Sequence, residues 1–177
     1  MTEAIRGQQE YNDNVQSARF LQLRYGAGNV IEPFLFRLFG ENHPRMVYWI
    51  SPWITHLDFR IANTKRLLQK IQFHRASLII VTREPKAGSK HEAFIRDARE
   101  MPTSSIFYMP RLHAKFYIAT TRERRYALLG SVNMYEWSNR SYELGVVIEA
   151  RGQGEALVDD LEHLAIDLRV AKNTNRV

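Results

Sequence analysis

The sequence has no cysteine among its 177 residues. This absence excludes disulfide frameworks, thiol nucleophiles, and zinc or iron–sulfur sites held by thiolates. Long apolar runs are also missing, because the apolar stretches at 30–39 and 47–54 are much shorter than the roughly 20 residues of a membrane-spanning helix. The N-terminal residues carry early acidic side chains and no apolar core. We therefore expect no secretory signal and no membrane insertion, and we expect a cytoplasmic protein.

The positive charge of the chain is concentrated in one segment. The whole chain has 25 lysine and arginine residues against 19 aspartate and glutamate residues, which gives a net charge of +6. Residues 60–125 hold 15 basic and 5 acidic side chains, whereas residues 143–177 hold 4 basic and 7 acidic ones. Concentrated positive charge favours a polyanionic partner such as nucleic acid or anionic lipid, although a basic soluble protein without such a partner can have the same total.

Apolar patterning predicts a mixed β-sheet flanked by helices, which is an α/β fold. Runs of β-branched and aromatic residues predict strands at 46–50, 76–82, 105–109, 112–119, 126–129 and 144–149. Apolar residues at helical spacing predict helices at 30–39, 58–71, 92–101 and 155–170. We expect one domain over residues 29–170, with an arm or short helix at 1–28 and a flexible tail at 171–177.

Two polar pairs in the middle of the chain carry the chemical information. His113 and Lys115 are two residues apart, so on a strand their side chains would point to one face. Ser131 and Asn133 repeat this spacing directly after an apolar strand and a glycine. A neutral histidine is a nucleophile or general base, and lysine, serine and asparagine offer donors to phosphate oxygens. With the Glu143 carboxylate to hold the histidine ring, the set suits phosphoryl transfer without a metal.

These residues resemble the HKD motif of the phospholipase D superfamily, which is written HxKxxxxD and is followed by GSxN. The chain reads His-Ala-Lys from position 113 and Gly-Ser-Val-Asn from position 130. The similarity is greatest to the small, single-motif phosphodiesterases and nucleases of that group, and it covers about residues 29–150. The aspartate of the motif falls at position 120, where this chain has Thr120.

The resemblance implies a phospholipase D-like α-β-α sandwich that hydrolyses phosphodiesters in two steps. In that mechanism His113 attacks phosphorus and becomes a phosphohistidine, while Lys115 and Asn133 bind the non-bridging oxygens. Ser131 orients the phosphate, and Glu143 positions the histidine ring. A second histidine must protonate the leaving group. Because this chain carries one motif, the resemblance implies a homodimer with both motifs at the interface, and it implies neither a metal nor another cofactor.

Other residues near the motif are candidates for contact with a polyanionic substrate. Basic side chains can track a phosphate backbone, and tryptophans can stack on bases. The expected substrate-binding residues are Trp53, His56, Lys86, Lys90, Arg111, Arg122, Arg124, Arg125 and Trp137. A solvated surface explains any single one of the basic residues equally well, and a packing or surface role explains His56 better.

Three functions remain open at this point. The first is a metal-independent nuclease acting on DNA or RNA, alone or as the cleavage subunit of a defence or restriction assembly. The second is a weakly active or inactive subunit that binds nucleic acid or a partner protein, and Thr120 in place of the motif's aspartate motivates it. The third is a phospholipase or phosphatidyl transferase, although such proteins normally have longer chains with two motifs.

Overall fold

One mixed sheet of eight strands organises the part of the chain that the computed structural model describes, which is residues 20–27, 30–40, 43–58, 63–135, 142–151 and 156–177. In chain order the elements are β1 (Phe20–Ala27), α2 (Glu32–Gly40), β2 (Pro44–Ile50), α3 (Thr64–Phe73), β3 (Ser77–Thr82), α4 (Lys90–Arg99), β4 (Ser104–Tyr108), β5 (Phe116–Thr121), β6 (Arg124–Gly130), β7 (Tyr142–Arg151), α5 (Ala156–Val170) and β8 (Asn175–Arg176). The ten elements expected from the sequence are present, with shifted ends. None of the described helices is long and apolar enough to cross a membrane.

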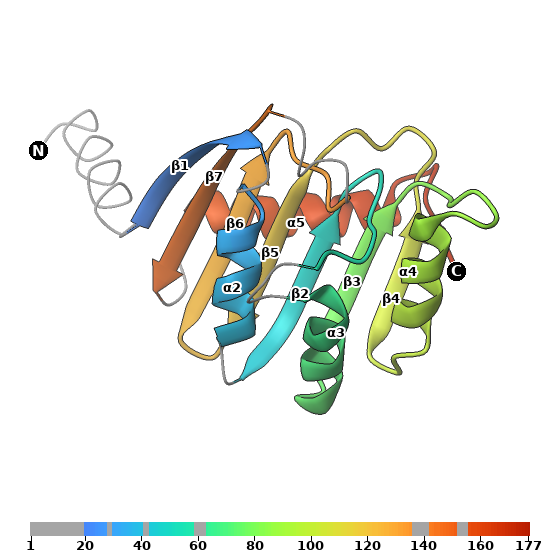
Figure 1. Cartoon of the computed structure of the whole chain (residues 1–177), viewed down its shortest axis with the longest axis horizontal. Coiled ribbons are helices and arrows are strands. Elements are labelled where there is room, and N and C mark those ends of the chain that lie inside the picture. The colour runs from blue at the N-terminus through green and yellow to red at the C-terminus, as the bar shows by residue number, and fades with distance from the viewer. Residues whose placement is uncertain (1–19, 28–29, 41–42, 59–62, 136–141, 152–155) are drawn as a thin grey trace, which may run out of the picture.

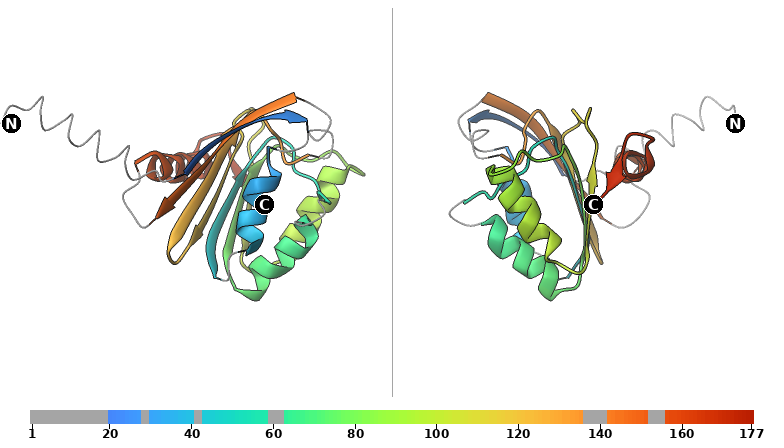
Figure 2. Two further views of the ribbon diagram at one scale, coloured as in Figure 1. Left: turned by 60° about the vertical axis from the view of Figure 1, so that its left-hand side comes forward. Right: turned by 90° about the vertical axis from the view of Figure 1, so that its right-hand side faces the viewer.

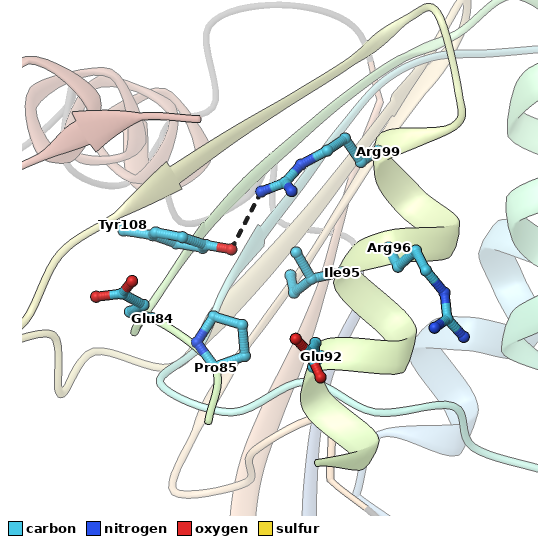
Figure 3. A pocket seen from close by; sticks show the side chains of 7 residues that line it. All are labelled: Glu84, Pro85, Glu92, Ile95, Arg96, Arg99 and Tyr108. Atoms are coloured by element: carbon cyan, nitrogen blue, oxygen red, sulfur yellow. Dashed lines mark hydrogen bonds between the residues drawn. The ribbon is translucent and has the colours of Figure 1, made fainter. Parts of the chain in front are cut away.

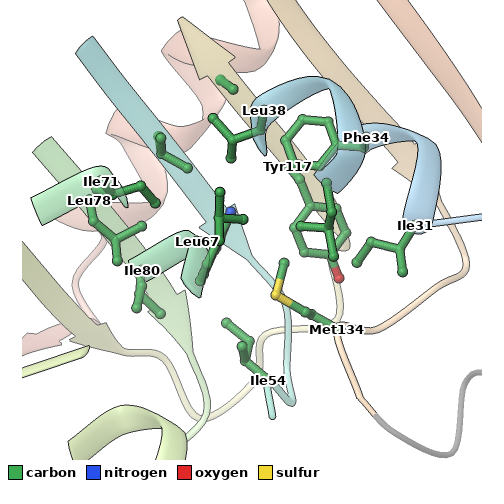
Figure 4. Packing of buried hydrophobic residues seen from close by; sticks show 14 of the residues in the cluster. Ile31, Phe34, Leu38, Ile54, Leu67, Ile71, Leu78, Ile80, Tyr117 and Met134 are labelled. Carbon is green, nitrogen blue, oxygen red and sulfur yellow. The ribbon is translucent and has the colours of Figure 1, made fainter. Parts of the chain in front are cut away.

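Helices cover both faces of the sheet, and successive side chains along a strand point to the two faces in turn. Helices α2, α3 and α4 lie on one face and α5 crosses the other, as Figures 1 and 2 show. Strand β5 sends Tyr117 into the hydrophobic cluster under α2–α4 and Phe116 and Ile118 into the cluster under α5. Figure 4 shows part of the first cluster, in which the Tyr117 ring centroid lies 6.0 Å from that of Phe34. The expected α/β sandwich is confirmed.

Strand directions bring the motif segments to one edge of the sheet. Strands β2, β3 and β4 are parallel to one another, whereas β5, β6 and β7 alternate in direction. Ile50 at the end of β2 therefore pairs with Phe116 at the start of β5, which in turn pairs with Leu129 near the end of β6. We call this end of the sheet the motif edge and define it by Ser51, Lys115, Ser131 and Glu143, which adjoin β2, β5, β6 and β7 there.

The motif histidine precedes a strand instead of lying on one, which corrects the expected strand at 112–119. Strand β5 begins at Phe116, because β2 ends opposite that residue and the chain then leaves the sheet at Ser51. On the other side, the Lys115 carbonyl still accepts a bond of 3.4 Å from the Gly130 N–H. His113 and Lys115 therefore lie on an irregular segment that leads into β5.

Two terminal segments also differ from the expectation. Residues 20–27 were expected in an arm or short helix, but they form β1 and pair antiparallel with β7. Asn175–Arg176, in the expected flexible tail, form β8 beside β4, and the Val177 N–H donates to the Ile106 carbonyl at 3.0 Å. In β1, Leu21, Leu23 and Tyr25 alternate with Gln22 and Arg24, a strand pattern that the sequence reasoning missed. Strand β8 has two residues, which is too short for any pattern to show.

A buried histidine fixes the loop that follows β2. Thr82 Oγ1, at the end of β3, donates to the Pro52 carbonyl at 3.1 Å and lies 3.1 Å from His91 Nε2 on α4. Because the hydroxyl has one proton, the His91 ring N–H is the donor in the second bond. The His91 side chain is buried, and this burial lowers its pKa to about 4. The neutral ring therefore belongs to the scaffold of the motif edge.

Acidification should weaken the fold through His91. Above a pH of about 6.5 the ring is neutral in both the folded and the unfolded chain, so its full contribution is present. As the pH falls toward 4, the unfolded chain takes up a proton that the fold resists, and the free energy of unfolding decreases by on the order of 2–3 kcal/mol. Urea unfolding at a series of pH values should show a shallower decrease for His91→Gln than for the unmodified chain.

The exposed His163 of α5 provides the matched control. His163→Gln makes the same chemical change at an exposed position and should keep the pH dependence of the unmodified chain. An unchanged slope in His91→Gln would contradict the role given to this residue.

Candidate active site

The motif side chains reach the motif edge from four different strands. Lys115 precedes β5, Ser131 and Asn133 follow β6, Glu143 is the second residue of β7, and Ser51 follows β2. Strand pairing, and not proximity in sequence, thus assembles the site. The structure brings together the pairs that the sequence left apart.

Ser131 fastens the end of β6 to the start of β7. Its N–H donates to the Leu144 carbonyl at 2.9 Å, and its Oγ accepts from the Leu144 N–H at 3.1 Å. The Ser131 hydroxyl in turn donates to Glu143 Oε2. Ser131 therefore fixes the carboxylate, and in the described part of the chain the hydrogen bond of Glu143 goes to Ser131 and not to His113.

Asn133 is held from β2 in a way that frees its amide donors. Ser51 Oγ is buried and lies 3.2 Å from Asn133 Oδ1 and 2.9 Å from the Trp53 carbonyl, and these two acceptors share its one proton. The Tyr117 hydroxyl donates to the Val132 carbonyl at 2.9 Å and fixes the intervening backbone. With Oδ1 engaged, the Asn133 Nδ2 group has no partner among the described residues, so it can donate to an anion.

Tyr117 acts as a neutral donor at this position. Its ring is fully buried under α2, and burial raises the pKa of the Tyr117 hydroxyl well above its ordinary value. Hydrogen bonds with Ser51 and with the Met134 backbone lower the pKa of Tyr117 in part, and the negative charge of Glu143 raises it further. The hydroxyl therefore keeps its proton, and with it the bond to the Val132 carbonyl, at neutral pH.

Lys115 and His113 lie on the segment that leads into β5 at the motif edge. The Lys115 ammonium donates to the His113 carbonyl at 2.7 Å. Burial lowers the pKa of Lys115, the Glu143 carboxylate raises it, and the Arg83 guanidinium lowers it further, with a net decrease. The His113 ring is exposed and has no hydrogen bond within the described residues. The edge thus combines an exposed imidazole, a cation and an amide donor.

Arg83 is a residue of this edge that the sequence reasoning missed. Its Nε–H donates to the Leu112 carbonyl at 2.9 Å, directly before His113, and its guanidinium carbon lies 5.0 Å from the centroid of the Trp53 ring. The signal in the sequence was its place immediately after β3. Because parallel strands end at the same edge of a sheet, a residue that follows β3 lies beside one that follows β2.

His56 connects the scaffold and does not face the motif residues. Its Nε2 lies 3.0 Å from Asp97 Oδ2 on α4, and its Nδ1 lies 3.4 Å from Thr64 Oγ1 on α3. The ring also packs edge-on against Phe94, with centroids 5.2 Å apart. Since both nitrogens have partners, the structure gives His56 the packing role that the sequence favoured.

Comparison with solved structures decides the fold. The structure matches Nuc from Salmonella typhimurium, a phospholipase D family member, with a TM-score of 0.63 and 12% identity over 89% of this chain and 97% of that chain. NucT from Helicobacter pylori matches with a TM-score of 0.60 and 11% identity over 84% and 96% of the two chains. A phosphatidylserine synthase from Haemophilus influenzae matches with a TM-score of 0.61 and 15% identity over 89% of this chain and 40% of that chain. The chain has the phospholipase D fold. No family model matches its sequence, and neither does any curated protein.

In this phospholipase D fold, the departure at Thr120 lies away from the motif edge. Thr120 is five residues beyond Lys115, which on a strand is roughly 17 Å. Its hydroxyl donates to Glu162 Oε1 on α5 at 2.8 Å. Glu162 also lies 3.6 Å from the buried guanidinium of Arg125. Helix α5 thus supplies a carboxylate beside the position where the motif has aspartate.

The arginines around the β5–β6 turn lie at the opposite end of this fold from His113 (Figure 1). Arg125 is buried and pairs with Asp159 of α5. Arg124 pairs with Glu149 of β7 at 3.3 Å, and Arg122 is exposed in the turn itself. The structure therefore does not bring these three arginines to the motif edge.

The remaining basic candidates follow strands that end at the motif edge. Lys86 and Lys90 are exposed after β3, and Arg111 is exposed between β4 and β5. Trp53 is exposed after β2. Trp137 lies outside the described residues. Within the described residues, no group of three or more histidine, aspartate and glutamate side chains is placed to hold a metal ion.

A separate hollow of about 430 Å³ lies between α4 and the segment after β3 (Figure 3). Its lining residues are Glu84, Pro85, Glu92, Ile95, Arg96, Arg99 and Tyr108. Arg99 donates to the Tyr108 hydroxyl at 3.3 Å, and glutamates offset the arginine charge. The hollow contains none of the motif residues, so we do not assign the motif chemistry to it.

Gly130 should be essential for the geometry of the site. A Cβ atom there would lie 2.2 Å from the Leu144 carbonyl oxygen and 2.8 Å from Gly145 Cα, which are closer than real contacts. Gly130→Ala must therefore push β6 away from β7, and we expect the free energy of unfolding to decrease by about 1–3 kcal/mol. Urea unfolding measures this change.

Gly40→Ala is the control for the Gly130 variant. A Cβ at Gly40, at the end of α2, meets no atom within 4 Å, so the free energy of unfolding should change by less than about 0.5 kcal/mol. Equal stability of the two variants would contradict the close approach of β6 and β7.

Proposed function

We propose that the chain is a phosphodiesterase of the phospholipase D type that hydrolyses DNA or RNA without a metal. The observation that carries the proposal is what gathers at the motif edge: the exposed His113, the Lys115 ammonium bonded to the His113 carbonyl, and the Asn133 amide after the neighbouring strand β6. Few other reactions need a nucleophilic imidazole beside a cation and neutral donors for an anion. The resemblance to single-motif nucleases points to the same chemistry.

The proposed reaction has two balanced steps. An unprotonated nitrogen of His113 attacks phosphorus, a new N–P bond forms, and the P–O bond to the leaving oxygen breaks as that oxygen receives a proton from a second histidine. Water, deprotonated by the same second histidine, then attacks phosphorus and releases His113. Lys115 and Asn133 stabilise the charge on the non-bridging oxygens in both steps. Ser131 keeps the Glu143 carboxylate at this edge, where it favours the cationic forms of its neighbours.

A second copy of the chain is the proposed source of the second histidine. Tyr142 and Leu144 flank Glu143 on β7, and their side chains are 92% and 53% exposed. Large apolar side chains that are this exposed beside a catalytic edge suit an interface. A two-fold contact there would bury the same patch of the motif edge on both copies, because a symmetric interface uses the same residues twice, and in the proposed dimer it brings the second copy's His113 to the phosphate.

Charge favours a nucleic acid over a lipid as the substrate. The segment 60–125 contains most of the positive charge, and its exposed Lys86, Lys90 and Arg111 follow strands that end at the motif edge. The distance of Thr120 from the motif edge favours an active enzyme over a binding-only subunit. The same chemistry would serve a free nuclease or the cleavage subunit of a defence or restriction assembly.

His113→Ala should abolish cleavage without unfolding the protein. Loss of the nucleophile should lower the rate by roughly 10³-fold or more. The His113 ring is exposed and has no hydrogen bond in the described residues, so the free energy of unfolding should change by less than about 0.5 kcal/mol. The assay is cleavage of labelled single- and double-stranded DNA and RNA in the presence of EDTA. His163→Ala, at an exposed histidine of α5, should cleave normally.

Two results would contradict these assignments in different ways. Full activity of His113→Ala would remove the nucleophile assignment. Loss of cleavage in EDTA, with recovery on addition of a divalent metal, would remove the metal-independent mechanism.

The lowered pKa of Lys115 should limit activity at alkaline pH. The protonated ammonium binds the phosphate, so kcat/KM should decrease as the pH rises through a value below the ordinary lysine pKa of about 10.4. Arg83→Gln removes a positive charge that lowers the pKa of Lys115, so the alkaline decrease should move to higher pH, whatever the absolute rate. Lys115→Arg should abolish the decrease, because arginine keeps its charge. A pH–rate profile that is identical in all three proteins would contradict this role.

A further inference from the structure

Trp53 presents a large apolar ring at the motif edge. Its side chain is 44% exposed, although tryptophan side chains are usually highly buried. Its backbone is fixed, because the Trp53 carbonyl accepts from Ser51 Oγ at 2.9 Å, and the same hydroxyl lies beside Asn133. The backbone of Trp53 is therefore held at the motif edge, beside Asn133.

Arg83 connects this ring to the catalytic segment. Its Nε–H bonds to the carbonyl of Leu112, the residue before His113, and its guanidinium lies over the Trp53 ring at 5.0 Å. The two terminal nitrogens of Arg83 have no hydrogen bond within the described residues. A guanidinium that is fixed by one nitrogen and free at two others can bind a phosphate through both. Its influence on the pKa of Lys115 is a second sign that the two cations share one site.

We propose that Trp53 and Arg83 form a subsite for the nucleotide next to the scissile phosphate, and that this subsite selects single-stranded nucleic acid. The Trp53 ring stacks on the base, and the free nitrogens of Arg83 bind that nucleotide's phosphate. The proposal rests on the proposed function and deepens it, since it names the strand state of the substrate.

Stacking requires an unpaired base. In a duplex each base lies between its neighbours, so a protein ring reaches its face only in a single strand, at an end or after the base flips out. Aromatic–base stacking is also tolerant of sequence, because every base has a π face. The subsite should therefore prefer single strands over duplexes with little base preference.

The test measures binding apart from cleavage. His113→Ala serves as the background, so that the probes stay intact, and fluorescence anisotropy gives the dissociation constant at fixed salt. The probes are a labelled single strand of about 12 nucleotides, an abasic strand with the same number of phosphates, and a duplex of the same length. The background protein should bind the strand with bases roughly 5- to 100-fold more tightly than the abasic strand. This comparison needs no change at Trp53, so it remains decisive if a Trp53 variant unfolds.

The variants separate the base contact from the phosphate contact. Trp53→Ala should weaken binding of the strand with bases by a similar factor and leave abasic binding within about twofold, whereas Trp53→Phe should retain most of the affinity. Arg83→Gln should weaken binding of both strands and lower the salt dependence of the binding constant by about one phosphate contact. Arg66→Gln, at an exposed arginine of α3, is the control for loss of a positive charge and should change neither.

The outcomes distinguish this proposal from the proposed function. Binding that depends on Trp53 but is accompanied by no cleavage in the unmodified protein would support the subsite and overturn the nuclease assignment. Cleavage with equal affinity for strands with and without bases would overturn the subsite and leave the nuclease. Loss of binding to anionic phospholipid vesicles in Trp53→Ala, with unchanged binding of single strands, would make Trp53 a membrane contact and overturn the subsite.

Discussion

The close approach of β6 and β7 at Gly130 is the contact on which the motif edge depends. At this point the Leu144 carbonyl occupies the place where any side chain at position 130 would begin. The approach allows the backbone and hydroxyl of Ser131 to bond with Leu144, which keeps Glu143 at the edge. The motif needs glycine at position 130 because no side chain fits between β6 and β7 there. The backbone φ of Gly130 is not positive, so its conformation does not require glycine.

The polar groups behind the site are satisfied before a substrate arrives. Buried hydroxyls of Ser51, Thr82 and Tyr117 bond to backbone carbonyls or to the Asn133 amide oxygen, and each bond holds a loop where the strand has ended. Leaving such groups unpaired would cost more than each bond contributes, so the loops have few alternative positions. In the proposed reaction, the Asn133 amide N–H group therefore needs no reorganisation to donate to a phosphate oxygen, which is the condition under which donors stabilise a transition state best.

The buried strands and the motif residues could be predicted from short stretches of sequence. The role of Arg83 could not, because it depends on contacts with residues far away in the chain. The residues from Met46 to Ile50 are all apolar or aromatic, which predicts a buried strand. The motif residues Gly130, Ser131 and Asn133 are recognisable from their order in the sequence. The place of Arg83 is not, because its partners Trp53 and Leu112 are about 30 residues away in either direction along the chain. Strand β8 has two residues and pairs through its backbone, so no side-chain period records it, whereas the alternation of Leu21, Leu23 and Tyr25 in β1 was a local signal that went unused.

The same reasoning explains why a threonine can stand where the motif has aspartate. A sheet with chemistry at one edge has its other end available for stabilising contacts, and here α5 packs across that end with Asp159 and Glu162 directed at Arg125. A carboxylate at position 120 would meet Glu162 at the distance where the hydroxyl now donates, and the two negative charges would compete for one buried cation. Thr120 instead gives Glu162 a proton to accept. Position 120 can therefore be threonine because α5 supplies the negative charge to Arg125. The substitution changes no residue of the motif edge.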